Sequence, residues 1–371
     1  MPADPTRMDP NALTDGGPDL SAPVAPVPPA PPVTDPTAVA APPVTDPTAF
    51  AAPQPPVAPA ASAHADLGGV AAFGERLRAG IRQAMQIAPE RLDIVLCTLL
   101  AGGHLLLEDQ PGVGKTQLAR SVAASIGGHF ARVQATVDLL PTDILGATVW
   151  HAGTATFEFH PGPVFANVLL ADELNRATPK TQSGLLEAMQ ELQVTVDGHT
   201  YALPRPFMVI ATQNPTAGFD GTYALPPAQL DRFLARMSLG YPTPGQEAAL
   251  LRDRPSPTNQ AVASLDELTA ARDAVSRVAA AEPLLAYIVA LLGATRAHPL
   301  AETGASPRSG LQLLAAARAR AALQGREYAL PDDVQALAYP VLAHRIQPVA
   351  AAPEGAQHEV VADALRQVPA R

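Results

Sequence analysis

The chain has 371 residues, a formal net charge of −10 and 41 prolines. Its acidic balance and the absence of blocks rich in Lys and Arg argue against a primary role in nucleic-acid binding. No apolar run is long enough to span a membrane, so no membrane insertion is expected. The single cysteine, Cys97, can form no intramolecular disulfide, which suits a cytoplasmic protein.

Residues 1–65 are almost entirely Pro, Ala, Val, Thr, Asp and Ser, and the segment PPVTDPTA occurs at 31–38 and again at 42–49. Such a composition cannot bury enough apolar surface to offset the entropy of ordering, which predicts a disordered Pro/Ala-rich tail. The segment has no basic start followed by an apolar core, so it does not resemble a secretory signal. A passive tail and a Pro-rich docking segment both remain open.

Residues 66–243 alternate apolar strands with helical stretches, which predicts an α/β domain built on a parallel sheet. The expected strands are 104–108, 130–135, 168–172, 207–212 and 235–239.

The first motif in this domain is EDQPGVGKT at 108–116, between an apolar strand and a predicted helix. A glycine-rich turn in this context directs backbone N–H groups at phosphates, while its lysine reaches the β- and γ-phosphates and its hydroxyl binds Mg²⁺. The P-loop pattern G-x-x-x-x-G-K-[ST] has glycine where this chain has Asp109. The residues expected to bind the nucleotide are Pro111, Gly112, Val113, Gly114, Lys115 and Thr116, and Thr116 is also expected to bind Mg²⁺.

The second motif is VLLADELNR at 168–176, an apolar strand that ends in Asp172 and Glu173. Asp172 can bind Mg²⁺ directly or through water, and Glu173 can polarise the attacking water. Taken alone, the two carboxylates could equally begin the next helix, where acidic residues suit the helix dipole. With a P-loop upstream, they indicate a site that hydrolyses a nucleoside triphosphate.

Two short hairpins are expected to interrupt the α/β pattern, at 147–160 and 193–203, and the second contains the tight-turn pair Asp197-Gly198. They could be edge ribbons without a role, or they could carry substrate contacts or pore elements. His151 and His160 lie nine residues apart around a turn, and no Cys or His cluster in the sequence has the spacing of metal ligands.

Residues 244–350 show no strand pattern and predict a second, helical domain, followed by a C-terminal tail at 351–371. Ser264 and Glu267 form a capping box, and Ser306-Pro307 is typical of a helix start. The expected helices are 264–280, 283–297, 307–324 and 332–344.

From about 70 to 350 the chain resembles the MoxR-type AAA+ ATPases. The stretches that carry the resemblance are VQATVDLLPTDILG (133–146), GPVFANVLLADE (162–173), ADELNRATPKTQSGLLEAMQE (171–191), ATQNP (211–215), GTYALPPAQLDRF (221–233) and GASPRS (304–309). The resemblance implies an AAA+ P-loop domain with a helical lid. The two hairpins then correspond to the helix-2 insert and the pre-sensor-1 insert.

The resemblance also implies roles for three further residues. Asn214 is similar to sensor 1, which orients the attacking water, and Arg308 to sensor 2, which contacts the γ-phosphate. Arg232, in LDRF, is similar to the arginine finger that completes a neighbour's site. The chain departs from the family pattern at Ile87-Ala88, in the segment expected to line the adenine, and at Pro227, where relatives carry a subunit-interface glutamate.

The function implied by the resemblance is ATP hydrolysis with Mg²⁺ in a homo-oligomeric, hexameric ring that remodels or matures partner proteins, with von Willebrand factor A-type domain proteins as partners. Alternatives are a chelatase-type or translocase motor subunit, and a nucleotide-gated scaffold that binds ATP with little turnover. In a further alternative, the Pro-rich tail is the main functional part and acts as an adaptor. The sequence names no client.

Overall fold

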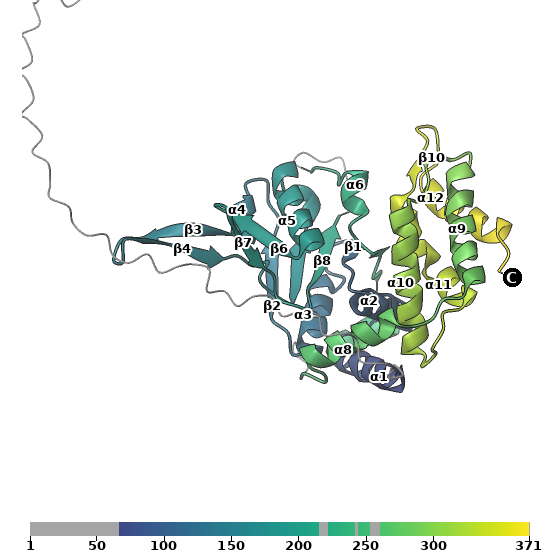
Figure 1. The fold of residues 1–371 in the computed structure, drawn as a ribbon, viewed down its shortest axis with the longest axis horizontal. Helices are drawn as coiled ribbons and strands as arrows, with labels where there is room; N and C mark the ends of the chain where they lie inside the picture. The colour runs from purple at the N-terminus through teal and green to yellow at the C-terminus, as the bar shows by residue number, and fades with distance from the viewer. Residues whose placement is uncertain (1–66, 215–221, 242–243, 253–259, 371) are drawn as a thin grey trace, which may run out of the picture. The chain divides into compact units, whose positions relative to one another are not determined.

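The computed structural model describes residues 67–214, 222–241, 244–252 and 260–370, so the expected tail at 1–65 lies outside the described residues. A five-stranded sheet in the order β2-β5-β8-β1-β9 forms the centre of the α/β part, and all of its strand pairs are parallel (Figure 1). Its strands are β1 (Leu105–Glu108), β2 (Phe130–Gln134), β5 (Val168–Asp172), β8 (Met208–Gln213) and β9 (Ala235–Met237). The five predicted strands are therefore all present.

Helices cover both faces of this sheet because its central strands β1, β5 and β8 are apolar on both sides. One face, which includes Leu105 and Leu170, packs into a core shared with the first three helices. The opposite face, which includes Leu106 and Leu169, packs into a second core with α5. The helices of this part are α1 (Leu67–Ala84), α2 (Pro89–Leu100), α3 (Lys115–Ser125), α4 (Pro141–Leu145), α5 (Pro179–Glu191) and α6 (Pro227–Leu230).

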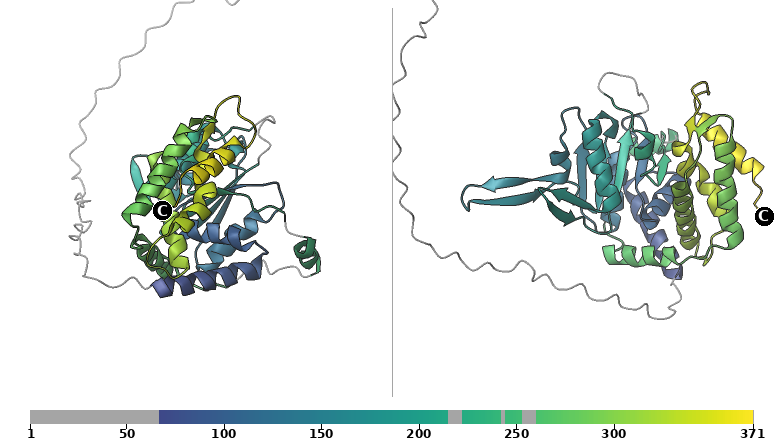
Figure 2. Two further views of the ribbon diagram at one scale, coloured as in Figure 1. Left: turned by 90° about the vertical axis from the view of Figure 1, so that its right-hand side faces the viewer. Right: turned by 45° about the horizontal axis from the view of Figure 1, so that its top comes forward.

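Both predicted hairpins are present. The first pairs β3 (Gly146–His151) with β4 (Thr156–Pro161), and the second pairs β6 (Gln193–Val196) with β7 (His199–Ala202). Asp197 and Gly198 both have positive φ, at 49° and 78°, as a tight hairpin turn requires. The β3–β4 hairpin extends away from the central sheet beside α4, which Figure 2 shows from a second direction.

Helices dominate the C-terminal part, as expected. Its helices are α7 (Pro244–Arg252), α8 (Leu265–Ser276), α9 (Glu282–Ala297), α10 (Pro307–Leu323), α11 (Pro331–Leu342) and α12 (Ala356–Gln367), and the short 3-10 helix η2 (Ala343–Arg345) follows α11. Another 3-10 helix, η1 (Leu174–Arg176), follows β5 in the α/β part. The predicted capping box of α8 is formed, and Ser306 caps α10 with Pro307 in its first turn, as predicted. Among the described helices, none combines the length and the apolar character that a membrane span needs.

Two features of this part differ from the sequence analysis. A short antiparallel pair joins β10 (Ala301–Thr303) to β11 (Gln347–Pro348), where only helices were expected. The segment expected to be a C-terminal tail contains α12, which buries Val360, Val361 and Ala364 against the helical part. Strands of two or three residues are too short to show an alternating pattern, and α12 follows a Pro- and Ala-rich stretch that conceals its apolar stripe.

A buried ion pair fixes the start of α11. The Asp333 side chain has 0% exposure and accepts hydrogen bonds from Arg320 at 2.6 Å and from Arg326 at 2.7 Å. Burial alone raises the pKa of this carboxyl. The hydrogen bonds from Arg326, the Leu330 backbone and Arg320 outweigh burial, so the net pKa lies below its usual value.

Replacing Asp333 with asparagine is expected to lower the free energy of unfolding by about 3 kcal/mol, because two arginines lose their counter-charge. Since the folded pKa is depressed, this stabilisation is complete above the unfolded pKa of about 4 and is lost as the pH falls through the folded pKa. Urea unfolding at several pH values measures both effects. The neighbouring exposed Asp332→Asn is the control, and an equal loss in both variants, or a loss that does not shrink in acid, would contradict the assignment.

Candidate ATP-binding and hydrolysis site

The glycine-rich loop connects β1 to α3. Gly112 and Gly114 have φ values of 88° and 97°, in the left-handed region that side chains disfavour, and Gly114 caps the N-terminus of α3. The Lys115 ammonium donates to the backbone oxygens of Asp109 at 2.7 Å and Gln110 at 3.2 Å. The loop therefore has the compact form of a phosphate-binding turn, with its lysine folded back over it.

Asp109, the departure from the P-loop pattern, has a structural role. Its buried carboxylate accepts hydrogen bonds from the Ser238 hydroxyl at 2.6 Å, the Leu239 N–H at 2.6 Å and the Gly240 N–H at 3.0 Å. Glycine at this position could make none of these bonds. The aspartate thus ties the start of the loop to the segment that leaves β9 toward the helical part.

Asp172 and Glu173 occupy the carboxyl end of β5, and Thr212 on the neighbouring strand β8 holds both of them. The Thr212 hydroxyl donates to Asp172 Oδ1 at 2.7 Å and accepts from the Glu173 N–H at 2.8 Å. Glu173 has φ 53° and ψ 44°, a left-handed conformation that is costly outside glycine and is common at functional sites. Its carboxylate pairs with Arg176 at 3.0 Å. The acidic pair therefore ends the strand and does not begin an α-helix.

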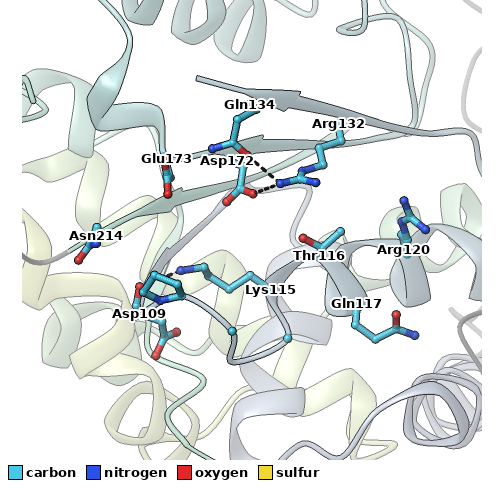
Figure 3. Close-up of a pocket in the computed structure, with 13 residues that line it drawn as sticks. Asp109, Lys115, Thr116, Gln117, Arg120, Arg132, Gln134, Asp172, Glu173 and Asn214 are labelled. Carbon is cyan, nitrogen blue, oxygen red and sulfur yellow. Dashed lines mark hydrogen bonds and ion pairs between the residues drawn. The ribbon is translucent and has the colours of Figure 1, made fainter. Parts of the chain in front are cut away.

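The two motifs line one cavity of about 510 Å³ at the carboxyl ends of the parallel strands (Figure 3). Because β8 lies between β5 and β1 in the sheet, Asn214, which directly follows β8, is placed between the two motifs. The sequence-predicted residues that the structure brings together here are Pro111, Gly112, Gly114, Lys115, Thr116, Asp172, Glu173 and Asn214.

The cavity also contains two arginines that the sequence analysis missed. Arg132 on β2 donates to Asp172 Oδ2 at 2.7 Å and to the Gln134 side chain at 2.7 Å (Figure 3). Arg120 lies on α3, one helical turn beyond Thr116, and its guanidinium stacks over a phenylalanine ring on β2. Two sequence signals could have placed these arginines at the cavity. Arg120 lies four residues after Thr116 on the same helix face, and Arg132 lies on one face of β2 by the alternation of a strand. The cavity is consequently more cationic than the motifs alone indicate.

Val113 faces a second cavity, of about 470 Å³, on the other side of the loop. Ile87 and Ala88, the positions where the chain departs from the MoxR-type pattern, line this cavity together with Leu239 and Tyr241. Its lining combines apolar side chains such as Met85 with the polar side chains of Gln86, Glu90 and Arg91. The departure at Ile87-Ala88 therefore changes the lining of a cavity that is still present.

Arg232 and Arg308 do not line the phosphate cavity. Arg232 follows α6 and donates to the Leu186 backbone oxygen at 2.5 Å. Arg308, in the first turn of α10, lies 3.8 Å from the Asp231 carboxylate, which also binds the buried Arg345 at 2.8 Å. Within its own chain, neither arginine therefore reaches the cavity that the two motifs line. Pro227 occupies the first turn of α6, where a missing N–H costs nothing.

Comparison with known proteins agrees with this geometry. Residues 104–235 match the ATPase family associated with various cellular activities (AAA), and residues 293–364 match an AAA lid domain. A solved structure of a putative ATPase from Cytophaga hutchinsonii superposes with a TM-score of 0.74 at 33% identity, covering 82% of this chain and 97% of that one.

Several curated proteins are also similar to this chain in sequence. YeaC of Bacillus subtilis is 48% identical over 255 residues, which cover 68% of this chain and 79% of that protein. Chaperone MoxR1 of Mycobacterium tuberculosis is 41% identical over 263 residues, covering 68% and 70%. Protein MoxR of Methylorubrum extorquens is 32% identical over 324 residues, covering 79% and 92%. With its phosphate loop, acidic pair and helical lid in one fold, the chain belongs to the MoxR family of AAA ATPases, which hydrolyse ATP.

Proposed function

We propose that the chain binds ATP with Mg²⁺ between the glycine-rich loop and the end of β5, and that it uses hydrolysis in a ring to remodel partner proteins. The observation that carries this proposal is the convergence of Lys115, Asp172, Glu173 and Asn214 on one cavity, with Arg232 outside it. The loop and Lys115, with Arg120 and Arg132, supply the positive field that a triphosphate needs. The adenine occupies the cavity next to Val113.

The acidic end of β5 fits a Mg²⁺ site. Thr116 and Asp172 both face the cavity, and a hydroxyl with a carboxylate is the oxygen donor set that Mg²⁺ binds together with phosphates and water. When bound, Mg²⁺ neutralises charge on the β- and γ-phosphates. Asp172 is held by Thr212 and Arg132 in the described structure, so Arg132 is positioned to release Asp172 and turn toward the phosphates.

Hydrolysis follows from positioning and electrostatics. Glu173 accepts the proton of the attacking water, and Asn214 orients that water at the adjacent strand end. The strained backbone of Glu173 and its N–H bond to Thr212 fix the direction of its carboxylate. Before attack, Glu173 must leave Arg176, with which it now pairs.

A neighbouring subunit completes the site. Arg232 lies outside its own cavity, so in a hexameric ring it is available to the γ-phosphate of the adjacent chain. Arg308 acts as sensor 2 when it exchanges Asp231 for the γ-phosphate, which couples the lid to the nucleotide. Relatives carry a subunit-interface glutamate where this chain has Pro227, so weaker assembly or slower hydrolysis is expected.

The remodelling activity is supported by the relative named chaperone MoxR1. We place the protein in the cytoplasm, with von Willebrand factor A-type domain proteins as partners. Lys115, Glu173 and Asn214 are all present at the cavity and argue against the scaffold alternative, whereas Ile87-Ala88 and Pro227 leave it open.

The test of nucleotide binding is Lys115→Ala. Calorimetry with ATP·Mg²⁺ should give a Kd raised roughly ten- to a hundredfold, since a hydrogen bond to a charged group contributes about 1.5–3 kcal/mol and about 1.4 kcal/mol is tenfold. Lys180→Ala is the matched control, because Lys180 is the only other lysine and is exposed on α5. Unchanged affinity in Lys115→Ala would remove the assignment of the loop.

A further inference from the structure

The β3–β4 hairpin has two chemically different faces. Directly opposed residues in its register include Val149 with Glu158 and Trp150 with Phe157. Because side chains alternate along each strand, Trp150 and Phe157 share one face, where their rings lie 4.9 Å apart. The opposite face carries His151, Glu158 and His160.

These three polar side chains converge. One ligand atom from each of His151, Glu158 and His160 lies within 4.8 Å of the other two. His151 Nε2 is 3.8 Å from a Glu158 oxygen, and the two imidazole rings are parallel to within 7° with centroids 6.4 Å apart. The spacing of nine residues in the sequence concealed this, because the antiparallel register folds the two histidines onto one face. The expectation that no histidine cluster has the spacing of metal ligands rested on the sequence alone and did not anticipate this approach.

We propose that this face of the hairpin, defined by His151, Glu158 and His160, binds a divalent transition-metal ion of the Zn²⁺ class. Two imidazole nitrogens and one carboxylate oxygen are donors that Zn²⁺ and Cu²⁺ prefer, whereas Mg²⁺ and Ca²⁺ select oxygen alone. Metal–nitrogen bonds of about 2.0–2.1 Å require the donors to approach more closely than they do now. All three side chains are exposed, so rotation about their own bonds brings them in without displacing packed neighbours.

Three protein ligands leave a coordination position for water or for a donor from a partner. A two-stranded hairpin is marginally stable alone, and a metal ion that joins β3 to β4 stabilises its folded form. The site lies on the β3–β4 hairpin and shares no residue with the phosphate cavity.

Trp150 provides a local probe, because it is the only tryptophan of the chain and is adjacent to His151. The untagged full chain, in excess Mg²⁺, is titrated with Cu²⁺ while tryptophan fluorescence is recorded, and Zn²⁺ is then added as a competitor. We expect saturable quenching at one ion per chain, relieved only by a large excess of Zn²⁺, because Cu²⁺ binds imidazole and carboxylate donors more tightly. His151→Ala and His160→Ala should each raise the half-saturating concentration at least about tenfold, since even ligand-supporting groups contribute that much.

His199→Ala is the matched control, because His199 is an exposed histidine on the other hairpin. It should titrate like the wild type, and all variants should retain wild-type ATP affinity, which reports an intact fold. Quenching that does not saturate, or that is the same in His151→Ala and His160→Ala as in the wild type, would overturn the proposal. An equal rise of the half-saturating concentration in His199→Ala would also overturn the proposal, because the ion would then not bind specifically to the β3–β4 hairpin.

Discussion

Replacing Arg232 with alanine is expected to preserve ATP binding and to lower ATP turnover roughly 10³–10⁵-fold, the contribution of an arginine supplied to a phosphoryl-transfer site by a neighbour. The structure explains why binding and turnover should respond differently. Arg232 does not line the cavity of its own chain and donates instead to the Leu186 backbone on α5. Steady-state phosphate release and ATP calorimetry measure the two effects separately.

The conservative variant Arg232→Lys should stay close to the alanine variant, because an ammonium lacks the planar fork that binds two phosphate oxygens. Mixing Arg232→Ala with Lys115→Ala should restore part of the turnover, since some interfaces then combine an intact loop with an intact arginine. If mixed rings form and remain inactive, Arg232 does not act on a neighbour. If monomers at high ATP concentration hydrolyse at the wild-type rate, the ring itself is excluded.

Replacing Glu173 with glutamine is expected to leave ATP affinity near the wild-type value and to slow hydrolysis at least about a hundredfold, within the roughly 10²–10⁴-fold range for loss of a general base. Glutamine keeps the size of the side chain and the N–H bond to Thr212, so the left-handed backbone at this position is retained. The amide can no longer accept the proton of the attacking water. Single-turnover hydrolysis measures the chemical step directly.

Glu187→Gln, at an exposed position on α5, is the control for a general change of charge. Turnover of Glu173→Gln within a few-fold of the wild type would place water activation on another group. If the prediction holds, the Glu173→Gln variant remains in the ATP-bound state. Proteins that co-purify with this variant, but not with Lys115→Ala, are then the candidate clients.

The sequence was sufficient for the features that depend on local chemistry. Three of the five strands, β1, β5 and β8, are largely apolar runs, and all five formed. The caps at Ser264 and Ser306 depend on contacts within one helical turn, and both formed as predicted. Gly112 and Gly114 of the phosphate loop occupy positive-φ positions, as the motif predicts, because glycine has no Cβ to oppose that conformation.

Tertiary structure decided what depends on residues far apart in the chain. Strand order placed Arg132 on Asp172 and Thr212 between the two acidic residues, and no spacing in the sequence encodes these contacts. The hydrogen bonds of Asp109 to residues 238–240 explain a departure from the P-loop pattern that local chemistry could not. The antiparallel register of β3 and β4 likewise brought His151 and His160 together. Local pattern fixes which residues lie on a strand, whereas the pairing of strands fixes which side chains meet.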